Sequence, residues 1–388
     1  MYSPKFRLVA YLTRQIVRFA ALIGLVQIVE MSPKGRLTQF TERLEPAIRR
    51  KLIRFKWFPP AIIAINPVPP PNYALYLYFS KKVHFINDNN NQRDTNIGPW
   101  YAQPSSPIKP LHLVKRRGSP WEMLPSQRTS KTWRLETSSL LGRLGIQEDK
   151  PIVLLAIRDS AYYESLQTDT SIIPGPETLP DTYIRNPEIV TYSLAAERLS
   201  ELGCAVVHFG SKTSSLPNSL SGSVFDYSGQ YRTPKDDLLL AQHCLMMMSG
   251  ASGAWALASL FNRPVSYSNL YVPFIGGVST RDLFMPQLLW NSKEQRLLSF
   301  QEMADTAGRY SYQSNCESDG IELIKNSAEE IADHALETFH RIRGTFVEHA
   351  EDLELHREFN RIQERSSSHQ NTRSPIGTTF LRKYRELL

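Results

Sequence analysis

Short apolar runs alternate with amphipathic segments through the second half of the chain. The runs have the length of strands, and the first of them, 152–157, is continuously apolar, as a strand buried on both faces should be. They cover residues 152–157, 205–209, 224–227, 245–248 and 265–268. Strands that alternate with helices at this spacing predict an α/β fold with a doubly wound parallel sheet.

The helical segments of this half carry recognisable start signals. Asn186-Pro187-Glu188 combines a capping amide, a first-turn proline and an acid near the positive helix end. Thr233-Pro234 begins the next helix, and Ser327-Ala328-Glu329-Glu330 is a capping box. Beyond that helix we predict a polar helical extension to about residue 365, a flexible stretch over 366–374 and a last short helix.

The first half of the chain has a weaker pattern. Residues 6–29 favour a basic amphipathic helix, and the proline-rich residues 57–71 favour a linker or two short strands. A helix over 73–79 and a strand over 83–86 follow, and 87–133 are expected to be loops. We therefore divide the chain into a basic helical region (1–56), a reduced, irregular N-terminal domain (57–137), a Rossmann-like domain (138–345) and a helical tail (346–388).

Charge separates the two halves. Of the 388 residues, the first 150 contain 24 Lys and Arg against 9 Asp and Glu, and the rest contain 21 against 29, giving a net charge of +7. The basic half is compatible with a helix on an anionic membrane surface and equally with a helix docked on the protein itself. Its longest apolar run is too short to span a bilayer. Nucleic acid is not expected as a partner, because no reader module is recognisable.

The cysteines give no sign of a metal site. Cys204, Cys244 and Cys316 are isolated in the sequence, without metal-ligand spacing, and no D-x-D element is present. These features predict buried thiols, a reducing cytoplasmic compartment and a reaction without a metal cofactor.

The most informative local feature is the strand-to-helix turn Ser249-Gly250-Ala251-Ser252-Gly253. Glycines allow close approach of the backbone, serines offer hydroxyl groups, and a following helix directs N–H groups at the turn. The turn lacks the lysine of a P-loop and the spacing of the dinucleotide fingerprint. It favours anion binding, but small residues here could also serve only to pack a helix against a sheet.

Polar residues follow the other predicted strands. Ligands of open parallel sheets bind beyond the carboxyl ends of the strands. Those positions hold Arg158 and Asp159 after the first strand, Gly210, Ser211 and Lys212 after the second, and Ser228 after the third. With the 249–253 turn they would suit a diphosphate, with Arg158 as its counter-charge. A local Arg158–Asp159 ion pair that braces the loop is the alternative.

Several of these motifs resemble a family of bacterial glycosyltransferases. The matching residues are Leu144-Gly145-Ile146, Arg158-Asp159-Ser160-Ala161-Tyr162, Tyr183-Ile184-Arg185-Asn186-Pro187, Phe225-Asp226-Tyr227-Ser228, the 249–253 turn, 261–264 and Asp282-Leu283-Phe284. The family is of the metal-independent type with two Rossmann domains (GT-B-like) and is associated with surface polysaccharides. The resemblance covers about residues 140–341.

The resemblance implies a nucleotide-sugar donor bound by the C-terminal domain and a glycan or other hydroxyl acceptor. Carried over to this chain, it places Arg158 and Asp159 in the catalytic site. It places Arg185, Asn186, Ser249, Ser252 and Gly253 at the donor. Two other interpretations stay open, a non-catalytic nucleotide-sugar or glycan-binding protein of the same fold and a membrane-surface scaffold. The location implied is cytoplasmic, peripheral to the inner membrane face.

Overall fold

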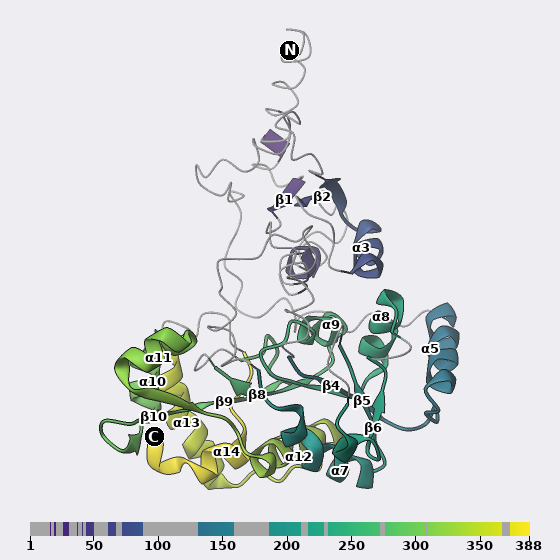
Figure 1. The fold of residues 1–388 in the computed structure, drawn as a ribbon. Coiled ribbons are helices and arrows are strands. Elements are labelled where there is room, and N and C mark those ends of the chain that lie inside the picture. Colours follow the sequence, from purple (N-terminus) through teal and green to yellow (C-terminus); the bar gives the residue numbers. More distant parts are fainter. Residues whose placement is uncertain are drawn as a thin grey trace. The chain divides into compact units, whose positions relative to one another are not determined.

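The chain forms two compact units, Met1–Pro125 and Ser126–Leu388 (Figure 1). The structure, a computed structural model, describes residues 16, 19–20, 26–30, 37, 41, 44–49, 61–66, 72–87, 131–158, 186–210, 216–228, 232–271, 276–306, 309–366 and 373–388. The predicted boundary at 137/138 falls inside a helix, α5 (Lys131–Arg143), that belongs to the second unit.

The first unit contains a parallel three-stranded sheet. Its strands are β1 (Val26–Glu30), β2 (Ala61–Asn66) and β3 (His84–Asn87), in the order β1-β2-β3. Helix α3 (Tyr73–Ser80) connects β2 to β3, and Asn72 caps it by accepting a hydrogen bond from the Leu75 N–H at 2.9 Å. The predicted helix and strand at these positions are confirmed. The predicted helix over 6–29 is wrong at its end, because β1 begins at Val26 and pairs with β2 across the predicted boundary at 56/57.

One member of the basic N-terminal group is buried. Arg49 is 3 % exposed and its Nε donates to Oε1 of Glu45 at 2.7 Å. A guanidinium enclosed in this way is neutralised by its own chain and cannot reach lipid headgroups. Arg49 therefore belongs to the core of the first unit.

The second unit is built on a six-stranded parallel sheet. Its strands are β4 (Ile152–Ala156), β5 (Ala205–His208), β6 (Val224–Asp226), β7 (Met246–Ser249), β8 (Val265–Leu270) and β9 (Leu283–Pro286). Their order is β6-β5-β4-β7-β8-β9, and every neighbouring pair is parallel. This arrangement confirms the predicted doubly wound sheet. The sixth strand, β9, was not predicted.

Helices cover both faces of this sheet (Figure 1). Helices α7 (Ser193–Glu201) and α12 (Ala328–Arg343) pack together on one face, and α5, α8 (Pro234–His243) and α9 (Trp255–Leu260) lie on the other. The predicted starts of α8 and α12 are confirmed, since Thr233 accepts from the Asp236 N–H and Ser327 forms a complete capping box with Glu330.

A second, antiparallel sheet flanks the first. It consists of β10 (Leu288–Asn291), β11 (Arg296–Leu297) and β12 (Ile321–Ile324), in the order β11-β10-β12. Between β11 and β12 the chain forms α10 (Phe300–Asp305) and α11 (Gln313–Asp319). None of these three strands was predicted, because each has only two to four residues and β12 pairs with a strand about 30 residues earlier in the chain.

The last part of the chain returns to the main sheet. After α13 (Ala350–Arg365), Ile376 forms a parallel bridge with Phe284 of β9. The Phe284 N–H donates to the Pro375 carbonyl at 3.1 Å, and the Gly377 N–H donates to the Phe284 carbonyl at 2.9 Å. This segment therefore covers the outer edge of the sheet, which would otherwise expose unpaired backbone groups.

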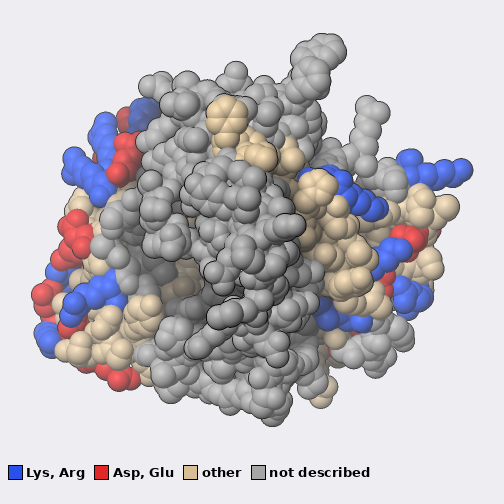
Figure 2. Space-filling model, turned by 90° about the horizontal axis from the view of Figure 1, so that it is seen from above, with Lys and Arg blue, Asp and Glu red and all other residues tan. Residues whose placement is uncertain are grey.

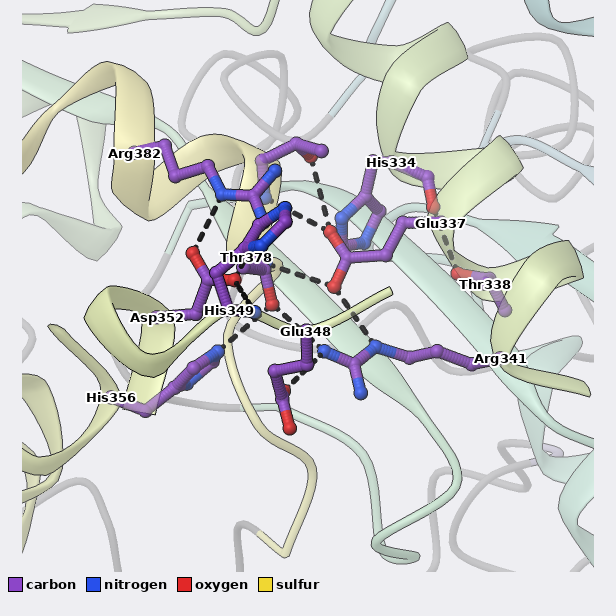
Figure 3. A network of polar contacts seen from close by, with 11 residues as sticks. His334, Glu337, Thr338, Arg341, Glu348, His349, Asp352, His356, Thr378 and Arg382 are labelled. Atoms are coloured by element: carbon purple, nitrogen blue, oxygen red, sulfur yellow. Dashed lines mark hydrogen bonds and ion pairs between the residues drawn. The ribbon is translucent and has the colours of Figure 1, made fainter. Parts of the chain in front are cut away.

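A polar network fixes the short helix that follows, α14 (Thr378–Lys383), to α12 and α13 (Figure 3). The side chain of Glu337 is 0 % exposed and accepts from the Thr378 N–H, the Thr379 N–H and Nε of Arg341, each at 3.0 Å. Glu337 thus caps α14 from another helix. Asp352 accepts two hydrogen bonds from Arg382, both at 2.6 Å.

Candidate functional site

The carboxyl edge of the main sheet has its switch point between β4 and β7. These strands are central neighbours, with Ala156 in register with Ser249. From β4 the chain continues to β5 on one side, whereas β7 continues to β8 on the other. Loops diverge at such a point, and ligands of doubly wound sheets bind there. Two predicted elements leave the sheet at this place, namely Arg158 and the 249–253 turn.

Arg158 is two residues beyond the end of β4 and is 8 % exposed. A guanidinium keeps its charge at any physiological pH, so residue 158 brings a permanently charged side chain to this edge of the sheet. Asp159 lies outside the described residues, as do Arg185, Ser211 and Lys212. Their predicted roles stay predictions.

Ser249 has a structural role. It is 0 % exposed, and its hydroxyl donates to the Ala156 carbonyl at 3.1 Å. The hydroxyl therefore joins the ends of the two central strands. We correct its predicted use as a donor-binding hydroxyl, because this side chain is turned into the sheet.

In the rest of the turn Gly250 is buried and residues 251–253 are partly exposed, and the helix that follows is short. Oγ of Ser252 accepts from the Ala254 N–H at 3.3 Å, and Gly253 follows it. Helix α9 has only six residues, so its dipole contributes little to the attraction of an anion. Backbone N–H groups and the charge of Arg158 would have to supply most of the attraction for an anion.

Gly250 lies where the turn, the end of β8 and the segment before α7 approach one another. A Cβ atom there would lie 3.4 Å from the Ser268 carbonyl oxygen at the end of β8 and 3.7 Å from Cγ of Pro187. The turn therefore touches the segment that precedes α7, as the predicted site requires. A glycine permits this approach because it has no side chain.

Asn186, next to Pro187, is not the predicted helix cap. The helical segment starts with a 3₁₀ turn, Ile189–Tyr192, and its cap position is Glu188. Within the described part of the chain, Oδ1 of Asn186 is shielded from solvent and has no hydrogen-bond partner. Buried amide oxygens normally have one. Among the described residues, Oδ1 of Asn186 is thus an acceptor beside the switch point without a hydrogen-bond donor.

Hydrogen bonds among buried polar residues hold the end of β8 near this edge of the sheet. The Tyr192 hydroxyl is 2.8 Å from Oγ of Ser268 and accepts from Nδ2 of Asn269 at 3.3 Å. Asn269 has a positive φ of 54° and exchanges hydrogen bonds with Asn326, at 2.6 and 2.8 Å. Burial raises the pKa of Tyr192, so its hydroxyl keeps its proton. These bonds hold the end of β8 in a fixed position behind Gly250.

A further polar cluster lies at the ends of β5 and β6. Oγ of Ser228 donates to Oδ1 of Asp226 at 2.9 Å, and Nδ1 of His208 is 3.2 Å from the same oxygen. Gly210 follows β5 at this end and is partly exposed. The sequence singled out Ser228 but neither His208 nor Asp226 as functional. The register of the two strand ends, which pairs His208 with Asp226, is the signal that would have found them.

No group of three His, Cys, Asp or Glu side chains within the described ranges is arranged to hold a metal ion. The three cysteines are buried and free, and burial raises the pKa of the Cys244 thiol to about 12. In the same ranges no helix has the length and apolarity needed to cross a membrane. On the described surface in Figure 2, basic and acidic side chains are intermixed.

No family model matches this sequence, and no curated protein matches it. Similar solved structures include a glycosyl transferase family 9 protein from Veillonella parvula, with a TM-score of 0.43 and 12% identity over 82% of this chain and 98% of that one. They also include the E. coli ADP-heptose LPS heptosyltransferase II, with a TM-score of 0.35 and 13% identity over 62% and 83% of the two chains. The iron-containing dodecameric heptosyltransferase TibC has a TM-score of 0.32 and 11% identity over 65% and 59%. Similarity at this level transfers no residue roles.

Proposed function

We propose that this protein is a glycosyltransferase that moves a sugar from a nucleoside-diphosphate donor to an acceptor hydroxyl. One observation carries the proposal: Arg158 and the 249–253 turn leave the two adjacent central strands at the switch point. A buried guanidinium next to a glycine-containing turn suits a diphosphate. The motif resemblance supplies the sugar and the acceptor, with a surface glycan as the expected acceptor.

In this mechanism the bond between the sugar and the diphosphate breaks while the acceptor oxygen attacks the sugar carbon. Negative charge grows on the departing diphosphate, and Arg158 with the N–H groups around Gly250 would stabilise it. The guanidinium would supply the positive charge that a divalent cation supplies in metal-dependent transferases. Asn186, Ser252 and Gly253 would contact the donor, and Asp159 would orient Arg158.

The test is turnover of a panel of nucleotide sugars by the wild-type chain and by Arg158→Ala. We expect Arg158→Ala to lower kcat by about 10²–10³-fold, as loss of one charge-stabilising donor does in other enzymes. Arg309→Ala is the matched control, since Arg309 is exposed and pairs only locally with Asp319 at 2.6 Å. Equal turnover by Arg158→Ala would remove Arg158 from the mechanism.

The same panel separates the alternatives. Thermal-shift binding of nucleotide sugars without turnover would favour a non-catalytic binding protein, and absence of any binding would refute both the transferase and the binding protein.

A membrane-surface role is tested by liposome flotation of the full chain with charge reversals at Arg7, Arg14 and Arg18. Deleting residues 1–56 would be a poor test, because it removes β1 from the first sheet.

A further inference from the structure

Three side chains at the ends of β5 and β6 form a closed hydrogen-bonded cluster. The distances are 2.9 Å from Oγ of Ser228 to Oδ1 of Asp226, 3.2 Å from Nδ1 of His208 to that oxygen, and 3.0 Å from Nδ1 to Oγ. All three residues lie at the carboxyl edge of the sheet, the edge that carries Arg158. They form the His208–Asp226–Ser228 cluster.

The directions of these hydrogen bonds follow from the chemistry of the groups. A carboxylate only accepts, so the Ser228 hydroxyl donates its single proton to Asp226. Nδ1 of His208 then carries a proton, shared between Oδ1 of Asp226 and Oγ of Ser228. Two donors thus fix one carboxylate oxygen and set the orientation of the whole group.

Burial divides the roles within the cluster. His208 is 2 % exposed, so its ring cannot reach a ligand, whereas the Asp226 side chain is 37 % exposed. A buried imidazole is costly unless it is hydrogen-bonded, and here its bond goes to the exposed carboxylate. His208 is therefore a positioning residue, and Asp226 is the group presented at the edge.

The position of Asp226 relative to Arg158 indicates what it meets. Strand β6 is two places from β4 in the sheet, a separation of ~10 Å at ~4.8 Å per strand. In doubly wound sheets that bind dinucleotides, an acidic side chain near the phosphate site accepts from a ribose hydroxyl. Here the strand next to β4 ends in the buried His208, and the acid comes from the following strand.

We infer that Asp226 accepts hydrogen bonds from the ribose hydroxyls of the donor nucleotide and is held in place by His208 and Ser228. The inference rests on the proposed function, because it assumes a diphosphate at Arg158. The nucleoside would extend from the switch point along the edge over β5 toward β6. Neighbouring hydroxyls are donors that match a carboxylate, and they are common to all ribonucleotides whatever the base.

The experiment measures binding to the full-length chain by calorimetry. The probes are UDP, ADP and GDP, their 2′,3′-dideoxy counterparts and inorganic pyrophosphate. For the ribonucleotide that binds best, we expect removal of both hydroxyls to weaken binding to the wild type about 10- to 100-fold, as loss of hydrogen bonds to a charged group does. The Asp226→Ala variant should bind the ribonucleotide more weakly than the wild type by the same factor. Its affinity for the dideoxy form should equal that of the wild type.

Pyrophosphate distinguishes this inference from the proposed function. Its affinity should fall in Arg158→Ala and stay unchanged in Asp226→Ala. If pyrophosphate and nucleotides all fail to bind, the proposed function is overturned together with the inference. If pyrophosphate binds through Arg158 but the hydroxyls make no difference, only the ribose inference is overturned. Equal losses for the ribo and dideoxy forms in Asp226→Ala would also overturn it, since they place the contact elsewhere on the nucleotide.

The positioning role of His208 has its own readout. His208→Asn keeps an N–H donor and should retain the preference for ribo over dideoxy nucleotides, whereas His208→Leu should lose it. Asp333→Asn, an exposed carboxylate on α12, is the control for the loss of one charge. Should a cluster variant fail to fold, equal affinity of the wild type for the ribo and dideoxy probes would still overturn the inference.

Discussion

The C-terminal polar network and the carboxyl edge of the main sheet use similar groups in opposite ways. In the network the side chains of Glu337 and Asp352 are 0 % and 2 % exposed, and donors from α12 and α14 surround them (Figure 3). At the edge the Asp226 side chain is 37 % exposed, and Oδ1 of Asn186 has no partner among the described residues. A carboxylate enclosed by its own chain maintains the architecture, whereas one presented at a sheet edge can bind a ligand. Substitutions in the network should therefore change stability, and those at the edge should change binding.

The largest effect is expected for Glu337→Ala. The substitution removes the cap of α14 and leaves the Thr378 and Thr379 N–H groups without their acceptor, which should cost about 1–3 kcal/mol for each buried donor left unpaired. Amide hydrogen exchange in α14, together with the urea midpoint, measures the loss. Glu354→Ala is the control, because its pair with Arg357 is exposed and should contribute less than ~0.5 kcal/mol. A loss below ~1 kcal/mol for Glu337→Ala would mean that the network is not structural.

The next largest loss of stability is expected for Gly377→Ala. A Cβ atom at this position would lie 2.4 Å from Nδ1 of the buried His334, so the helix or the ring has to move. Overpacking of this kind costs about 1–3 kcal/mol. Thermal unfolding measures it against Gly142→Ala in α5, where a Cβ meets nothing within 4 Å and alanine should stabilise the helix by roughly 0.5–1 kcal/mol. Equal melting temperatures for the two variants would contradict the packing described around His334.

Low pH should lower the stability of the protein by protonating Asp352 in the C-terminal polar network. Hydrogen bonds from Arg382 lower the pKa of Asp352 to about 2, below the roughly 3.9 of an unfolded chain. The stability that this carboxylate contributes is therefore present above about pH 4 and is lost as the pH falls through about 2. Thermal midpoints of the wild type and Asp352→Asn should differ most near neutral pH and converge toward pH 2. A constant difference across this range would show that the pair with Arg382 does not set the pKa.

The smallest effect on stability is expected at the edge, for Gly250→Ala. The added methyl group would meet its nearest neighbours at 3.4 to 3.9 Å, close to ordinary contact distances, so the loss should stay below ~1 kcal/mol. Pyrophosphate affinity should nevertheless fall several-fold, because the methyl group points at Pro187 and the Tyr192 hydroxyl and so displaces the segment that carries Asn186 at the edge. A large loss of stability with unchanged affinity would reverse the comparison between edge and network.

Local signals in the sequence were sufficient for the centre of the second unit. The runs that became β4 and β7 were predicted because they are almost entirely apolar, and those that became β5 and β8 because short apolar segments alternate with helices at a regular spacing. Thr233 and Ser327 cap helices through residues only three positions away. The strands of the antiparallel sheet have only two to four residues each, too few to show a periodic pattern, and β12 pairs with a strand about 30 residues earlier. Strand β9 was missed for a similar reason, since it has four residues and ends at Pro286, a residue that is rare inside strands.

The sequence predicted where the candidate residues lie on the sheet, but not their side-chain contacts. Placing Arg158 and the 249–253 turn at one edge required only the order of strands and helices. The inward hydroxyl of Ser249 and the position of the Asn186 amide depend on side-chain directions that a linear pattern does not contain. The pairing of His208 with Asp226 depends on the register of two strands, which the sequence alone leaves open.

The bridge between Phe284 and Ile376 has a consequence for biosynthesis. A ribosome makes β9 well before it makes Ile376, so the outer backbone groups of β9 have no partner from this segment while α10 to α13 are being translated. An unpaired strand edge in a nascent chain is a site for association with other chains. We therefore expect translation products that stop before residue 373 to aggregate or to require chaperones.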